Sequence, residues 1–206
     1  MRLVLWRHGR TAHNLSGRFQ GQLDTPLDEL GVRQADEAAQ VLARLGPDRI
    51  VASDLTRAAD TAAALAAVTG LPVEHDPALR ETDVGAWQGL TREQIADRWP
   101  EDMAAWLRGE DVVHGGGESR GQAGRRTYEA ILRHVAAVGD GVLVVTSHGG
   151  ALRGAMLHLL GLPIEHWGTF GGLGNARWAE LVPRGDRWRL LEYNAGVTSA
   201  RAGDEG

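Results

Sequence analysis

The sequence contains no cysteine and no lysine, and no apolar run in it approaches the length of a transmembrane helix. Without cysteine, disulfides, thiolate nucleophiles and cysteine-ligated metal sites are excluded. The N-terminus also lacks the basic region and the long apolar segment of a signal peptide. We therefore expect a protein of the cytoplasm that has no association with a membrane.

The chain also has little excess charge, with a formal net charge of −5. A negative net charge argues against general nucleic-acid binding, which needs a basic face. An anionic small molecule is still compatible with it, because a local cluster of arginine and histidine can reverse the electrostatic field inside one cleft. The 206 residues are enough for a packed core, and the sequence has no internal repeat.

The N-terminal stretch carries the first functional signal. Residues 3–6 are apolar and lead directly into Arg7, His8 and Gly9. This order predicts a buried strand that feeds a loop at its carboxyl end, where open α/β sheets bind their ligands. Arginine offers a planar fork of donors for phosphate or carboxylate, and histidine is a nucleophile or proton carrier at neutral pH.

Two later segments repeat this pattern. Residues 49–57 begin with a short apolar run that ends in polar residues, and Arg57 falls in the first turn of an alanine-rich helix that we expect Asp54 to cap. Residues 142–147 form the clearest strand in the sequence, and His148 comes directly after it. Three strands thus bring cationic side chains to one edge of a sheet, which predicts a phosphate site. Backbone N–H groups at the start of the helix after Gly149 would add to it.

Four segments, in order and spread over nearly the whole chain, carry a more specific signature: Leu5-x-Arg7-His8-Gly9-x-Thr11-x-x-Asn14, Ser53-Asp54-Leu55-x-Arg57-Ala58-x-x-Thr61, Arg80-Glu81-x-x-x-Gly85-x-Trp87-x-Gly89 and Ser147-His148-Gly149-Gly150. Together they resemble the histidine phosphatase superfamily, the phosphoglycerate-mutase-like family. A bare Arg-His-Gly is a weak motif, whereas four ordered segments at domain-scale spacing are a strong one.

The resemblance implies an α/β fold: a three-layer sandwich with a mostly parallel central sheet flanked by helices. It implies a single domain over residues 1–206, with a small helical cap inserted at roughly 86–117. Thr91 and Gln94 have the spacing of a capping box at the start of a helix in that cap. Residues 195–206 are small and polar, which predicts a mobile tail.

The activity implied is that of a phosphomonoesterase that needs no metal or other cofactor and forms a phosphohistidine on His8. A neutral imidazole is a competent nucleophile at pH 7, provided that a hydrogen bond to one ring nitrogen leaves the other aimed at phosphorus. Arg7, Arg57 and a protonated His148 would stabilise the charge on the transferring phosphoryl group. By the resemblance, Glu81 is the proton donor and acceptor.

Six further residues are expected to contact the substrate: Asn14, Gln20, Gly21, Arg10, His13 and Gly149. The family places Gln20 and Gly21 in a loop over the phosphate, although a solvated connector fits the same sequence. Arg10 departs from the family, which has Glu or Gln there; it would either bind a second anionic group or point to solvent. His13 would either contact substrate or lie exposed.

Three functions other than that of a phosphatase are compatible with parts of the sequence. A metal site is disfavoured because the remaining histidines are dispersed, without ligand spacing. A catalytically weak phosphate-binding module is disfavoured because all five chemical positions are intact. A phosphoglycerate mutase would need clustered cations in the cap to hold a bisphosphate, whereas Arg92, Arg98 and Arg108 are scattered among acidic residues.

Within the family, three loops narrow the resemblance further: Gln20–Thr25, Gly116–Arg120 and Gly171–Trp178. They are similar to the glucosyl-3-phosphoglycerate phosphatases, so glucosyl-3-phosphoglycerate is the candidate substrate. The partner expected is therefore a small phosphomonoester. The sequence allows a homodimer without fixing the oligomeric state.

Overall fold

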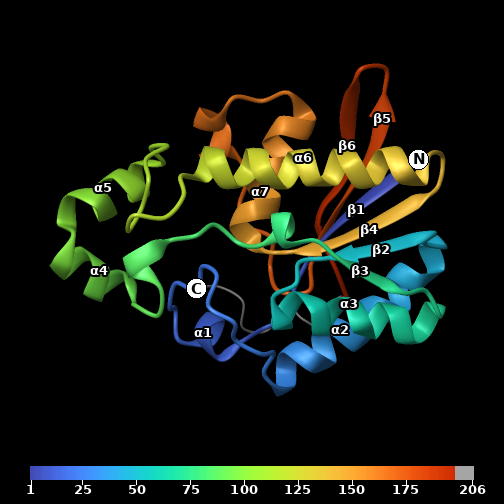
Figure 1. Ribbon diagram of the computed structural model, residues 1–206, viewed down its shortest axis with the longest axis horizontal. Helices are drawn as coiled ribbons and strands as arrows, with labels where there is room; N and C mark the ends of the chain where they lie inside the picture. The colour runs from blue at the N-terminus through green and yellow to red at the C-terminus, as the bar shows by residue number, and fades with distance from the viewer. Residues whose placement is uncertain (198–206) are drawn as a thin grey trace.

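The computed structural model describes residues 1–197 and contains one six-stranded sheet in the order β3-β2-β4-β1-β5-β6 (Figure 1). The strands are β1 (Arg2–Arg7), β2 (Arg49–Ala52), β3 (Val73–His75), β4 (Val142–Ser147), β5 (Trp178–Arg184) and β6 (Arg187–Ala195). The first four are parallel, and the hairpin formed by β5 and β6 adds to β1 in the antiparallel sense. The predicted mostly parallel sheet is confirmed.

Helices cover both faces of the sheet, so the predicted three-layer sandwich is also confirmed (Figure 1). One layer contains α2 (Glu29–Leu42) and α3 (Thr56–Thr69), and the other contains α6 (Arg120–Val138) and α7 (Gly149–Leu160). Residues of β1 alternate between the layers, since Leu3 and Leu5 pack against α6 and α7 while Val4 and Trp6 pack against α2 and α3. A strand buried on both faces must be apolar throughout, which is why β1 reads as one apolar run.

The two helices of the second layer touch closely at a pair of glycines. A Cβ on Gly124 of α6 would lie 2.7 Å from the Cα of Gly154 on α7, so neither position has room for a side chain. This contact brings the N-terminal half of α6 against α7, close to the edge of the sheet where β1 and β4 end.

The shorter elements are α1 (Ala12–Leu15), α4 (Arg92–Arg98), α5 (Pro100–Arg108) and the 3-10 turns Ala43–Leu45, Pro77–Leu79, Gly85–Trp87 and Ile164–Thr169. The predicted cap range thus contains α4 and α5, and the capping box of Thr91 and Gln94 is present. These helices share a separate apolar cluster, built on Trp87, Ile95 and Met103, beyond the end of the main sheet (Figure 1).

Two details of the sequence prediction are corrected. Asp54 does not cap α3, whose N-cap is Leu55. The Asp54 carboxylate instead binds Arg80 through two hydrogen bonds of 2.8 and 2.5 Å, and such a bidentate, charge-assisted pair is stronger than a single cap bond. The predicted tail begins too early, because Ala195 still pairs with Trp178 in the sheet. The rest of that prediction, from residue 198 onward, lies outside the described residues.

None of the helices in the described part of the chain combines the length and the apolar character needed to cross a membrane.

Candidate active site

Three parallel strands end side by side at one edge of the sheet, with β4 lying between β1 and β2. His8 follows β1 and His148 follows β4, and their ring centroids are 5.1 Å apart. Arg57, in the first turn of α3, donates from Nε to Nδ1 of His148 at 3.2 Å. The structure therefore brings together three of the side chains that the sequence assigned to a phosphate site.

His8 is held in the form that a nucleophile needs. Its side chain is buried, and Nδ1 lies 2.7 Å from the carbonyl oxygen of Gly9, an arrangement in which Nδ1–H donates. Nε2 then carries the lone pair. Burial, together with the charges of Arg57 and Arg7, holds the pKa of His8 well below 6.5, so the imidazole is neutral at pH 7.

This environment predicts a pH dependence. Because the pKa of His8 is lowered, its ring is expected to stay neutral as the pH falls from about 7.5 to about 6, where an ordinary histidine becomes largely protonated. Nitrogen-15 NMR of the histidine rings measures this directly, with the His8 signals assigned by their loss in His8→Gln. An imidazolium pattern with a midpoint at or above 6.5 would contradict the prediction.

Arg57 is fully buried and is fixed by backbone acceptors. Nη1 donates to the carbonyl of Leu23 at 2.7 Å and Nη2 to that of Gly21 at 2.8 Å. One N–H on each terminal nitrogen is left for phosphate oxygens. Burial lowers the pKa of Arg57 to about 10, so it stays charged at neutral pH. Gly21, expected at the phosphate, thus contributes a carbonyl that positions Arg57.

The environment of His148 favours a neutral ring, whereas the sequence predicts a protonated one. Burial and the charge of Arg57 hold its pKa well below 6.5. Its Nδ1 accepts from Arg57, so the ring proton is on Nε2, which lies 2.9 Å from Oγ of Ser53. Two cations within hydrogen-bond distance cannot both keep their charge in a dry site, and the guanidinium prevails because its intrinsic pKa is far higher.

The Glu81 carboxylate lies at the N-terminus of α7, where backbone N–H groups can bind an anion. Its carboxylate accepts from the backbone N–H groups of Thr82, Gly150 and Ala151 at 2.8, 3.0 and 2.8 Å. The helix N-terminus that the sequence assigned to phosphate therefore binds this carboxylate instead. A Cβ on Gly150 would lie 2.6 Å from Oε1 of Glu81, so glycine is required for the approach.

Asn14 and Gln20 lie beside the His8 loop. Oδ1 of Asn14 accepts from the backbone of Thr11 at 3.1 Å and from Asn175 at 3.2 Å, and Oε1 of Gln20 accepts from Oγ1 of Thr11 at 3.0 Å. Both amide oxygens are therefore used within the protein, and the amide nitrogens are the groups that could donate to a phosphate.

Arg10 and His13 follow the His8 loop directly in the chain, and the charge of Arg57 acts on His13. Arg10 donates from Nε to Asp28, the N-cap of α2, in a 2.8 Å ion pair, so one side of its guanidinium is engaged within the protein and its contact with a substrate stays a prediction. A fixed carboxylate at hydrogen-bond distance outcompetes water for the guanidinium. His13 lies on α1, and burial lowers its pKa.

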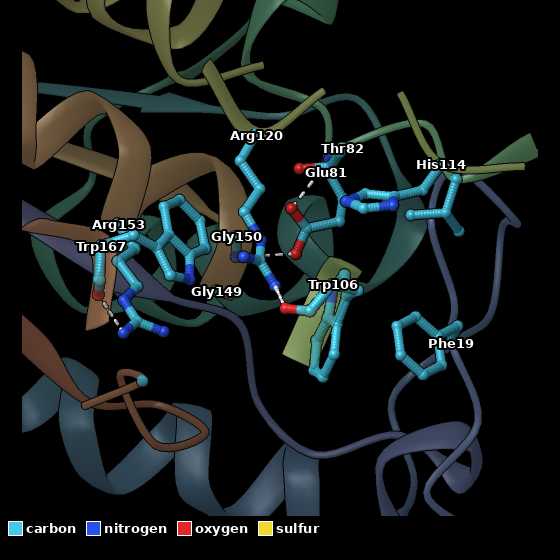
Figure 2. A pocket seen from close by; sticks show the side chains of 12 residues that line it. Phe19, Glu81, Thr82, Trp106, His114, Arg120, Gly149, Gly150, Arg153 and Trp167 are labelled. Carbon is cyan, nitrogen blue, oxygen red and sulfur yellow. Dashed lines mark hydrogen bonds between the residues drawn. The ribbon is translucent and has the colours of Figure 1, made fainter. Parts of the chain in front are cut away.

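A pocket of about 240 Å³ opens next to Glu81, Gly149 and Gly150 (Figure 2). The cap side contributes Phe19, Val84, Trp106 and His114, and the helices α6 and α7 contribute Arg120 and Arg153; Thr82, Trp167 and Gly172 complete the lining. Glu81 and the first residues of α7 thus belong to the lining of this pocket.

No group of three or more His, Asp or Glu side chains suited to a metal ion occurs within residues 1–197.

The comparisons with known proteins agree with this geometry. The family model described as histidine phosphatase superfamily (branch 1) matches residues 3–196. The chain belongs to the histidine phosphatase superfamily. Glucosyl-3-phosphoglycerate phosphatase of Mycolicibacterium vanbaalenii is 42% identical over 97% of this chain and 96% of its own. Metal-independent phosphoserine phosphatase of Arabidopsis thaliana is 39% identical over 93% of this chain and 80% of its own.

A solved structure gives the same result. The mycobacterial glucosyl-3-phosphoglycerate phosphatase in complex with VO3 is 44% identical and superposes with a TM-score of 0.89, covering 95% of this chain and 99% of that one. The expected membership of the histidine phosphatase superfamily, the phosphatase class and the narrower resemblance to the glucosyl-3-phosphoglycerate phosphatases are thereby confirmed.

The superfamily motifs contain Glu81, Gly149 and Gly150, but they do not contain the other side chains that line the neighbouring pocket. Arg120, Arg153 and Trp106 lie outside the four motifs, and Trp106 both packs against the cap cluster and lines the pocket. One signal was available for Arg153: it lies four residues after Gly149 in the same helix, and such residues share a helix face. Arg120 directly follows Ser119, the N-cap of α6.

Proposed function

We propose that this member of the superfamily is a metal-independent phosphomonoesterase that acts through a phosphohistidine on His8. The observation that carries the proposal is the state of the His8 ring. Its Nδ1 is tied to the Gly9 carbonyl, its Nε2 is free to attack, and its pKa is lowered. A histidine kept neutral beside Arg57 favours attack on an anion over a role as a simple phosphate ligand.

The reaction takes two steps, transfer of the phosphoryl group to His8 and its hydrolysis. The lone pair of His8 Nε2 attacks phosphorus while the bond from phosphorus to the ester oxygen breaks, and Glu81 in its acid form gives the leaving oxygen a proton. Glu81 then takes a proton from water, whose oxygen attacks phosphorus and releases inorganic phosphate and free His8. In both steps Arg57 and Arg7 stabilise charge on the phosphoryl oxygens.

Glucosyl-3-phosphoglycerate is the substrate that we propose to test first. The support is the 42% identity over nearly the whole length of a phosphatase named for that compound. The pocket beside Glu81 also leaves room for a leaving group much larger than water.

A mutase is the second candidate, and one observation favours it. Arg120 and Arg153 place two cations in the pocket, although the cap sequence itself has no cluster of them. In contrast to a phosphatase, a mutase must keep water away from the phosphohistidine. Supplying 3-phosphoglycerate with catalytic 2,3-bisphosphoglycerate separates the two, because a phosphatase releases phosphate faster than it forms 2-phosphoglycerate.

The proposed function predicts that phosphate release survives a chelator. Phosphomonoesters, including sugar phosphates and phosphoglycerates, should be hydrolysed equally well before and after treatment with EDTA, and vanadate should inhibit as a five-coordinate mimic of the transferring phosphoryl group. The measurement is phosphate released per enzyme. Activity that disappears in EDTA and returns with Zn²⁺ or Mn²⁺ would refute the metal-free mechanism.

A further inference from the structure

Two arginines meet in the pocket beside Glu81 and are held there by tryptophans. The Arg120 guanidinium lies 4.9 Å from the ring centre of Trp106 and 5.1 Å from that of Trp167. Arg153 lies 4.7 Å from the ring of Trp167. Figure 2 shows Arg120 reaching into the middle of the pocket, with Trp167 and Arg153 on one side of it. Arg120 is thus held against two tryptophan rings and Arg153 against one.

Neither arginine is neutralised by the protein. Within residues 1–197, no carboxylate forms an ion pair with Arg120 or Arg153. Nη2 of Arg120 donates to the Trp106 carbonyl and Nη2 of Arg153 to the Trp167 carbonyl. Nη1 of Arg120 and Nε of Arg153 are buried without a hydrogen-bond partner among the described residues. Buried donors without a partner are costly, and both side chains line the pocket beside Glu81.

The electrostatics of the pair also favour an anion. Burial and the charge of Arg153 lower the pKa of Arg120 to about 10. Asp111 is the acid that acts on Arg120 most strongly, but its Oδ1 accepts from the backbone of Gly121 at 2.7 Å. A ligand carboxylate near the two guanidiniums would reduce their repulsion and could accept from N–H groups that their bonds to the Trp106 and Trp167 carbonyls leave over.

The position of the pair limits which part of a substrate it can meet. Glu81 lines the same pocket as Arg120 and Arg153, and in the proposed reaction it protonates the leaving oxygen. The alcohol part of the ester therefore extends from Glu81 toward the arginines. The phosphate itself is bound at the sheet edge by other cations, so the arginine pair is available for a second anionic group.

We propose that Arg120 and Arg153 form a subsite for a carboxylate on the leaving alcohol, so that the enzyme selects phosphomonoesters of hydroxy acids. The subsite rests on the proposed function, because it takes its orientation from His8 and Glu81. It also gives a role to residues that the phosphoryl-transfer chemistry does not use.

The test compares 3-phosphoglycerate with glycerol 3-phosphate, which differ only in a carboxylate against a hydroxymethyl group. The wild-type kcat/KM is expected to be about 10- to 100-fold higher for 3-phosphoglycerate, the range for hydrogen bonds to a charged group. Arg120→Gln should remove most of this ratio, mainly through KM, and Arg120→Lys should retain part of it. Arg125→Gln, an exposed arginine of the same helix, is the matched control and should keep the ratio.

A binding measurement gives a second readout that needs no variant. With p-nitrophenyl phosphate as substrate, glycerate should inhibit wild-type enzyme competitively and glycerol should not. Equal inhibition by both, equal wild-type kcat/KM for the two esters, or an equal loss on both esters in Arg120→Gln would refute the subsite while leaving the phosphatase intact. Absence of hydrolysis of all three esters would instead refute the proposed function.

Discussion

Replacement of His8 by glutamine is expected to reduce phosphate release by about 10⁴-fold or more, the scale of loss when an enzyme's nucleophile is removed. Glutamine can keep a donor near the Gly9 carbonyl, but it has no lone-pair nitrogen to attack phosphorus. Rapid quenching of wild-type enzyme with labelled substrate should also trap an acid-labile, alkali-stable phosphoenzyme that His8→Gln does not form.

The control for His8 is another histidine changed in the same way. His75 is exposed at the end of β3, which two strands separate from β1 in the sheet, so His75→Gln should keep both the rate and the phosphoenzyme. Wild-type turnover in His8→Gln, or a phosphoenzyme in that variant, would show that another residue is the nucleophile.

Glu81→Gln is expected to slow hydrolysis of glycerol 3-phosphate by about 10²- to 10⁴-fold, the contribution typical of general acid–base catalysis. The loss should be smaller on p-nitrophenyl phosphate, because nitrophenolate leaves readily without a proton. The quantity to measure is the ratio of kcat on the two esters within the same variant. A general weakening of the fold lowers both rates and leaves this ratio unchanged.

Glu93→Gln provides the comparison, since Glu93 is an exposed acid in the first turn of α4. It should leave the ratio at its wild-type value. Equal losses on both esters in Glu81→Gln would mean that Glu81 serves to fix the start of α7, through its bonds to Gly150 and Ala151, and not to move the proton.

Local patterns in the sequence predicted the scaffold well. The apolar runs of β1 and β4 are buried on both faces, and the capping box at Thr91 is present because its two bonds join neighbours in the chain. The sequence also predicted that His8 and His148 would meet, since parallel strands deliver their carboxyl ends to one edge.

Several differences between prediction and structure involve competition between distant partners. Asp54, predicted to cap a helix, binds Arg80 instead, and Arg10, for which the sequence allowed a substrate contact or solvent, pairs with Asp28. The charge state of His148 depends on Arg57, which is 91 residues away. Which of several possible partners a charged group takes depends on tertiary distances that spacing along the chain does not contain.

The glycine contact between α6 and α7 has a consequence for how substrate range could change. Gly124 is one helical turn beyond Arg120, and Gly154 is the neighbour of Arg153. The distance between the two helices at this crossing point therefore sets the spacing of the two guanidiniums. A single methyl group added there would wedge the helices apart and widen the spacing of the two charges, without altering any residue that touches the phosphoryl group. The same displacement would move the N–H groups of Gly150 and Ala151 that hold Glu81, so substrate selectivity and proton transfer are mechanically coupled through α7.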